Sequence, residues 1–144
     1  MRGISLIRQL ALINLAFVAL QPLSAGLFLS GYGGAVTAHT TVALSLQLGA
    51  LVQAIIAIVL WRRDRAPAWV AGISIGLLLM VSVQLGLGYT RRYWLHVPVG
   101  VGMFGWLMGQ VNRLTTLKIS NGTRVSGADG ELRNRLNRES AGRG

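Results

Sequence analysis

Residues 38–60 read AHTTVALSLQLGALVQAIIAIVL, a stretch without a single charged side chain. On either side of it, two more uncharged stretches cover residues 9–29 and 68–89. At about 1.5 Å per helical residue, each can cross roughly 30 Å of hydrocarbon. A fourth stretch, residues 95–112, is close to the lower limit of about 17 residues for a span. The sequence therefore predicts an all-α integral membrane four-helix bundle.

The composition supports this prediction. Apolar residues make up 52% of the 144 residues and charged residues 12%, about half the charged share of a soluble domain. We expect one domain, a bundle over residues 1–117, followed by a basic, flexible, disordered cytoplasmic tail over residues 118–144, where Ser, Asn, Gly and Arg dominate. The net charge of +10 gathers where helices leave the bilayer, which favours lipid rather than nucleic acid as the partner.

The basic residues also predict an orientation. Arg2 and Arg8 precede the first span, residues 62–65 supply three arginines between the second and third, and the tail is basic. The positive-inside rule then gives a multi-pass protein of the cell membrane with both termini cytoplasmic. Arg91 and Arg92 fall outside and break the pattern. Either this short loop tolerates the violation, or the two arginines hold an anionic group.

The scarcity of reactive side chains excludes several functions. The chain has no cysteine, and its only carboxylates are Asp64, Asp129, Glu131 and Glu139, all outside the apolar stretches. Disulfides, iron–sulfur clusters and membrane-embedded carboxylate sites are therefore excluded. No nucleophile with a base is present, so we expect an electron carrier or an accessory subunit rather than a stand-alone enzyme.

The first span also resembles a secretory signal, with residues 23–25, Leu-Ser-Ala, as a possible cleavage site. The apolar stretch continues to residue 29, so we predict a retained span.

Small residues and amides are expected to hold the spans together, because the hydrophobic effect does not drive helix association in lipid. Gly72-x-x-x-Gly76 and Gly105-x-x-x-Gly109 predict faces where backbones approach closely. The following amides lie at membrane depth and need partners: Asn14, Gln21, Gln47, Gln53 and Gln84.

Two histidines stand out. His39 opens the second span and His96 opens the fourth, where Pro98 is expected in the first helical turn. Spans two and four run in the same direction and are diagonal neighbours in a four-helix bundle, so both imidazoles can face one flat ligand. This arrangement predicts a bis-histidine haem b site with His39 and His96 as axial ligands of the haem iron. Ala43 and Gly100, one turn further on, would leave clearance for the porphyrin.

The same hypothesis gives the external arginines a role. Arg91 and Arg92 would lie at the level of the haem propionates. The second nitrogen of each imidazole would donate to Thr40, Thr41, Gln84 or a backbone carbonyl.

Other readings of the histidines remain open. A histidine at a membrane interface is often only a polar residue at headgroup level. Zinc would find half of a tetrahedral site, since no cysteine or embedded carboxylate is available. A transporter would require a broken helix or a charge at mid-depth, and neither is clear.

Three segments carry a family resemblance: Ala38-His39-Thr40-Thr41 through Gly49, residues 84–88 (Gln-Leu-Gly-Leu-Gly), and Leu95-His96-Val97-Pro98 through Gly100. Over about residues 20 to 112 the chain resembles one four-helix half of heme A synthase and, more loosely, small diheme membrane cytochromes b. It also looks like small actinobacterial four-span membrane proteins with a Leu-His-Val-Pro segment in the last span.

The resemblance implies histidine-ligated b-type haem at His39 and His96. The chain departs from heme A synthase in having no second half, embedded glutamate or cysteine pair, so that enzyme's oxidation chemistry is not implied. It departs from diheme cytochromes in having histidines for one haem only.

The sequence thus predicts a single-haem, bis-histidine b-type cytochrome that transfers electrons near the outer leaflet, with a quinone or a redox protein as partner, or that binds haem for a partner. The alternative is a cofactor-free accessory or structural subunit of a larger membrane complex.

Overall fold

The computed structural model describes the backbone of residues 2–141 and, within that range, the side chains of residues 3–117, Glu131, Arg133 and Arg138. Four helices follow one another along the chain: α1 (Arg2–Leu29), α2 (Ala35–Arg62), α3 (Ala68–Tyr89) and α4 (Tyr93–Ala141). Helices α1, α2 and α3 are long and apolar enough to cross a membrane. These observations confirm the predicted integral membrane four-helix bundle.

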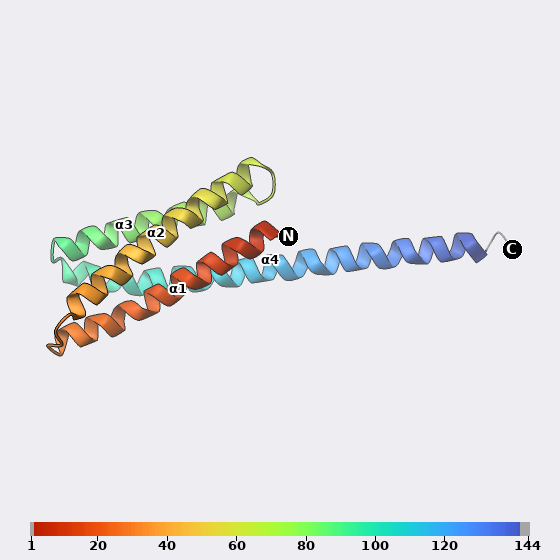
Figure 1. Ribbon diagram of the computed structural model, residues 1–144. Helices are drawn as coiled ribbons and strands as arrows, with labels where there is room; N and C mark the ends of the chain where they lie inside the picture. The colour runs from red at the N-terminus through yellow and green to blue at the C-terminus, as the bar shows by residue number, and fades with distance from the viewer. Residues whose placement is uncertain (1, 142–144) are drawn as a thin grey trace.

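The helices form an antiparallel square (Figure 1). Helix α1 packs against α2 and α4, and α3 packs against the same two neighbours, which leaves α2 and α4 on one diagonal, as predicted. The α1–α2 and α3–α4 turns lie at one end, which we call the histidine end. The start of α1 and the α2–α3 connection lie at the opposite end.

Three helices end in the same way, with a residue in the left-handed conformation. Gly31 (φ 78°), Asp64 (φ 55°) and Arg91 (φ 55°) occupy these positions after α1, α2 and α3. The N–H of each of these residues donates to the carbonyl three residues earlier. The N–H of the next residue donates to the carbonyl five residues earlier, as in the 2.9 Å bond from Arg92 N to the Leu87 carbonyl. This double bond pattern is the Schellman motif, which satisfies carbonyls that the helix leaves free.

The interior consists of two apolar clusters separated by a polar layer. The cluster at the opposite end includes Ile7, Val70 and Leu114, and the cluster toward the histidine end includes Leu46 and Leu107. Between them lies what we call the central polar layer, with one residue from each helix, all at most 2% exposed: Asn14, Gln53, Ser74 and Gln110.

Hydrogen bonds join the central polar layer across the bundle. The Asn14 side-chain amide donates to Gln53 Oε1 at 3.0 Å, and Gln53 Nε2 donates to Ser74 Oγ at 3.2 Å. Gln110 Nε2 also donates to Ser74 Oγ, at 3.4 Å, and that hydroxyl donates to the Val70 carbonyl. The prediction that Asn14 and Gln53 find partners inside the bundle is confirmed. Ser74 and Gln110 were not singled out from the sequence.

The glycine motifs behave differently from the prediction. Only Gly76 makes a close approach, because the Trp106 ring occupies the place of its missing Cβ. Gly72, Gly105 and Gly109 face open space in this chain. Gly49, outside both motifs, is the glycine that admits Asn14, whose Oδ1 lies where a Cβ would stand.

Helix α4 differs most from its predicted bounds. It is not among the three helices with a sufficiently apolar window, although it packs along α1 and α3, so its role as a fourth span stays a prediction. Its backbone continues as a helix to Ala141 and projects from the bundle as a single rod (Figure 1). No proline follows Pro98, and glycines weaken a helix by about 1 kcal/mol each without blocking it. Leu117, at the predicted boundary, is partly buried against the core, so the described packing extends to this residue.

Candidate functional site

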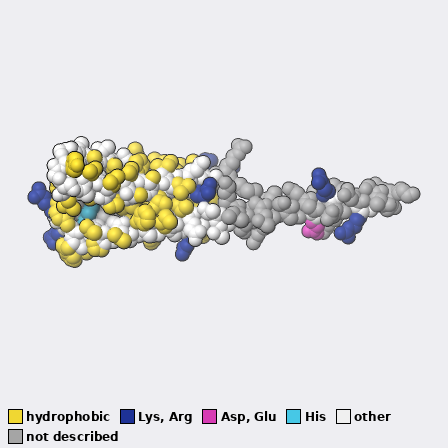
Figure 2. All heavy atoms as spheres, turned by 90° about the horizontal axis from the view of Figure 1, so that it is seen from below, with side chains coloured by type: hydrophobic (Ala, Val, Ile, Leu, Met, Phe, Trp, Pro, Cys, Tyr) yellow, Lys and Arg dark blue, Asp and Glu magenta, His cyan; other side chains and the backbone are white. Residues whose placement is uncertain are grey.

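The structure brings His39 and His96 together. Both lie about one turn inside their helices, on the diagonal pair α2 and α4, and both are half-buried. Their ring centroids are 6.2 Å apart and their planes are inclined at 56°. The histidine colour shows through the surface close to one end of the bundle in Figure 2. The expectation of matching depth on diagonal helices is therefore confirmed.

Helix α1 holds the His39 ring through Ser24. Ser24 Oγ lies 2.9 Å from His39 Nδ1 and, at 2.9 Å, donates its own hydrogen to the Gln21 carbonyl. Because this hydroxyl has a single hydrogen, it accepts from the imidazole, and we assign the proton of His39 to Nδ1. Ser24 is 7% exposed. In the sequence, Ser24 was noted only as part of the possible cleavage site. Its position three residues after Gln21, on the same face of a helix, was the one sequence feature that could have indicated its role.

Helix α3 holds the His96 ring through Gln84. His96 Nδ1 lies 3.1 Å from the backbone carbonyl of Gln84, which can only accept, so Nδ1 carries the proton here too. The Gln84 side chain makes a second bond, from Nε2 to the His96 carbonyl at 2.6 Å. The predicted acceptors included Gln84 and a backbone carbonyl. In the structure the acceptor of His96 Nδ1 is the backbone carbonyl of Gln84.

Gly100 leaves room for the Gln84 side chain that bonds to the His96 carbonyl. A Cβ at Gly100 would lie 2.8 Å from Gln84 Nε2, so the glycine leaves room for the amide. The space that the sequence assigned to a porphyrin face is thus filled by Gln84, and clearance at Gly100 stays a prediction that requires the amide to move. Ala43 is half-buried one turn after His39, where its predicted clearance is likewise open to test.

The donor set fits a metal held between two imidazoles. With Nδ1 of each ring engaged by an outer partner, each Nε2 keeps a free lone pair, the form that ligates metals. Two imidazoles in line on one ion, with bonds of about 2.0–2.1 Å each, have ring centroids about 6 Å apart. Rotation about these bonds leaves the interplanar angle free. A 6.2 Å separation also falls within the range of about 4.5–7 Å for ordinary ring pairs, so the shared tautomer is the more specific feature.

The site is rich in acceptors and poor in donors. The side-chain oxygens of Gln21 and Gln84 are buried and have no hydrogen-bond partner among the described residues. Buried acceptors of this kind call for an absent donor, water or positive charge. Among the described residues, no group of three or more His, Cys, Asp or Glu side chains gathers into a metal site, so a conventional zinc site does not fit.

Arg91 and Arg92 are exposed in the α3–α4 turn, one turn outward from His96. The Arg92 carbonyl accepts from His96 N at 2.9 Å, which ties the turn directly to the histidine's helix. Contact of either guanidinium with a propionate stays a prediction.

Pro98 lies deeper in α4 than expected, because the helix begins at Tyr93. The prediction that it costs no hydrogen bond is therefore wrong: the proline ring removes the N–H that would bond the Trp94 carbonyl. Pro22 similarly lies inside α1.

No family model, curated protein or solved structure matches this chain.

Proposed function

We propose that this membrane protein binds one haem b between His39 and His96 and acts as a single-electron carrier at the histidine end. The observation that carries the proposal is the histidine pair itself: two rings from diagonal helices, with centroids 6.2 Å apart and both Nδ1 atoms engaged, a tautomer that leaves the lone pair on each Nε2. When bound, haem supplies the reversible one-electron couple.

The chain's own residues would hold and orient that group. His39 and His96 would ligate the iron, and their bonds to Ser24 and to the Gln84 carbonyl would fix the tautomer and raise ligand basicity. Arg91 and Arg92 would neutralise the propionates. With the iron held by two histidines, no coordination position would stay open, so the group would supply electron transfer rather than oxygen chemistry.

The position of the pair implies a partner. Both histidines lie near one end of a bundle whose helices span about 30 Å of hydrocarbon, so one haem there does not carry an electron across the membrane. A quinone or a redox protein must complete the transfer. With the positive-inside orientation, the histidine end faces outward in the cell membrane and both termini are cytoplasmic.

An optical spectrum tests the proposal. The detergent-purified protein should show a sharp reduced α-band after dithionite, at about one haem per chain. His39→Ala and His96→Ala should each abolish the bis-histidine spectrum. Gln47→Leu, on the same helix as His39 but bonded through its side chain to Ser82, should leave it unchanged. If the wild-type protein stays colourless when haem is supplied during expression, the proposal fails and the cofactor-free accessory subunit becomes the better account.

A further inference from the structure

Arg8 is a charged residue inside the packed part of helix α1. From the sequence it precedes the first span, but the part of α1 that is apolar enough to cross a membrane begins at Gly3. Its chain neighbour Ile7 and the residue three positions later, Ala11, are fully buried in the cluster at the opposite end of the bundle. A charged side chain in a membrane-spanning helix is costly and calls for a partner.

Arg8 lies on the flank of α1 that faces α4. Gly3 and Asn14 mark the flank toward α2, because they approach Leu60 and Gln53 of that helix. At about 100° per residue, Arg8 is turned by roughly 120–140° from both. Since α1 packs only against α2 and α4, this turn brings Arg8 to the boundary between α1 and α4, which we call the α1–α4 seam.

The bundle offers Arg8 no counter-charge. Asp64 is exposed in the α2–α3 connection, and the other three carboxylates belong to residues 129–139, well beyond Leu117 on α4. Arg8 forms no ion pair or hydrogen bond with any side chain that the structure describes. The α1–α4 seam therefore holds an uncompensated positive charge.

The guanidinium of Arg8 is held in place but is not enclosed. Its Nε is buried and has no acceptor among the described residues, whereas its two terminal nitrogens are not buried in this way. The side chain as a whole is half-buried. The covered inner part fixes the group in the seam, and the outer edge, with its two terminal nitrogens, remains accessible to a ligand.

The residues along this flank follow the order of the parts of a phospholipid. Ser5, one turn nearer the end of the helix, is half-buried and carries a hydroxyl, and Arg8 carries the positive charge. Leu12, one turn deeper on the same flank, is 42% exposed and offers an apolar surface. A headgroup, a phosphate and an acyl chain would meet these three residues in turn.

We propose that Arg8 binds the phosphate of an anionic phospholipid in the α1–α4 seam. A guanidinium is always charged, and its two outer N–H groups match two phosphate oxygens. Arg8 is about 9 Å along the helix from Arg2, and the apolar Leu12 follows it, so a ligand that enters the bilayer fits better than a soluble anion. In the predicted orientation this end faces the cytoplasmic leaflet, where anionic lipids gather. The site lies at the other end from the proposed haem and does not depend on it.

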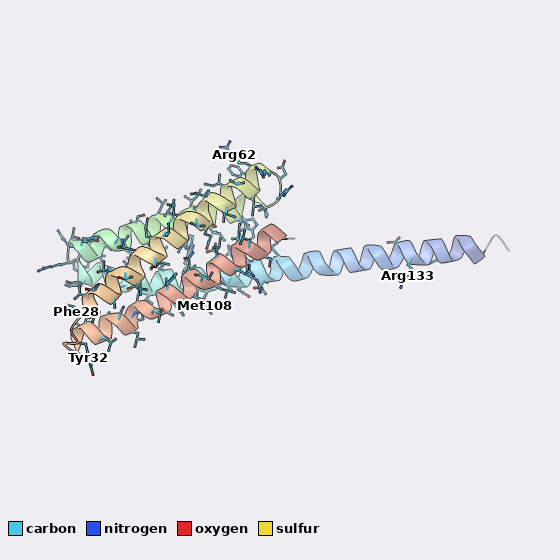
Figure 3. The ribbon with its side chains drawn as sticks, viewed as in Figure 1. Phe28, Tyr32, Arg62, Met108 and Arg133 are labelled. Carbon is cyan, nitrogen blue, oxygen red and sulfur yellow. The ribbon has the colours of Figure 1, made fainter. Side chains whose placement is uncertain are left out.

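Lipid retention by the whole protein tests the proposal. The protein is reconstituted in nanodiscs with equal amounts of phosphatidylglycerol and phosphatidylcholine and transferred to a mild detergent, and the retained lipids are counted by native mass spectrometry. We expect the wild type to retain phosphatidylglycerol preferentially. Arg8→Gln should lower the ratio of the two retained lipids about tenfold, because a charge-assisted bond is lost. Arg62→Gln is the matched control: it removes one exposed charge from the same end, where Figure 3 labels Arg62, and should leave the ratio unchanged.

Three outcomes overturn the proposal. An unchanged ratio in Arg8→Gln shows that the guanidinium only reaches water, and an equal fall in Arg62→Gln assigns retention to the general charge of this end. Displacement of the retained lipid by inorganic phosphate assigns the seam to a soluble anion. Arg8→Lys covers the case in which Arg8→Gln does not fold: it keeps the charge without the planar fork, and it should retain less phosphatidylglycerol than the wild type. Equal retention by Arg8→Lys and the wild type also contradicts the proposed two-pronged phosphate contact.

Discussion

Replacing Gln53 by leucine tests the importance of the central polar layer for stability. Gln53 is fully buried, accepts from Asn14 at 3.0 Å and donates to Ser74 at 3.2 Å. Leucine has a similar size, so the substitution removes two interhelical hydrogen bonds and leaves the Asn14 amide without a partner. Lipid chains are as apolar as leucine, so the gain from greater apolarity is small.

The expected loss follows from the number of bonds. Interhelical hydrogen bonds in membranes contribute about 0.6 kcal/mol on average and up to roughly 1.7 kcal/mol. Two such bonds, together with an orphaned buried amide, give a loss of about 2 kcal/mol in the free energy of unfolding. The double variant Asn14→Leu/Gln53→Leu should lose about 1 kcal/mol less than the sum of the single variants, since the two amides share one bond.

Unfolding by sodium dodecyl sulfate, followed by circular dichroism in mixed micelles, measures these differences. Gln47→Leu is the matched control on the same helix: its bond to Ser82 is exposed, and its loss should cost well under 1 kcal/mol. A Gln53→Leu protein as stable as the Gln47→Leu protein, or fully additive single variants, would refute the argument that the central polar layer is a coupled, stabilising network.

Three further substitutions test the histidine site and its turn. Ser24→Ala removes the acceptor of the α2 histidine and should weaken haem binding about 10- to 100-fold in a titration of the apoprotein, whereas Ser82→Ala should not. Gly100→Ala adds a methyl group where clearance for the porphyrin is predicted, so it should weaken haem binding. The methyl group also displaces the Gln84 amide; the lost bond and the gain in helix propensity, each about 1 kcal/mol, nearly cancel in stability. Gly102→Ala faces open space on the same helix, so it should raise stability and leave haem affinity unchanged. Arg91→Gly relieves a left-handed arginine and should stabilise the fold by about 1 kcal/mol; a stability loss would contradict the strain argument.

The sequence by itself determined the helices and their order. In lipid, backbone groups must bond within the segment, so each uncharged stretch of sufficient length has to be a helix. The predicted third span, residues 68–89, coincides with α3, and the predicted second span, residues 38–60, lies within α2. Short connections then fixed the antiparallel order, which placed the two histidines on diagonal helices at one depth.

Only the tertiary structure decided which polar groups meet. Helices that are apolar on every side give no periodic signal for the face that turns inward, so residue spacing did not distinguish the fully buried Gln53 from the half-buried Gln47. For the same reason the sequence did not predict that Ser24 would hold His39, or that Ser74 would join amides from two other helices. It also assigned helix contacts to glycines that face open space, because a glycine permits a close approach without specifying the neighbour. The rotation of each helix about its own axis is set by packing against the others, and these contacts exist only once all four helices are assembled.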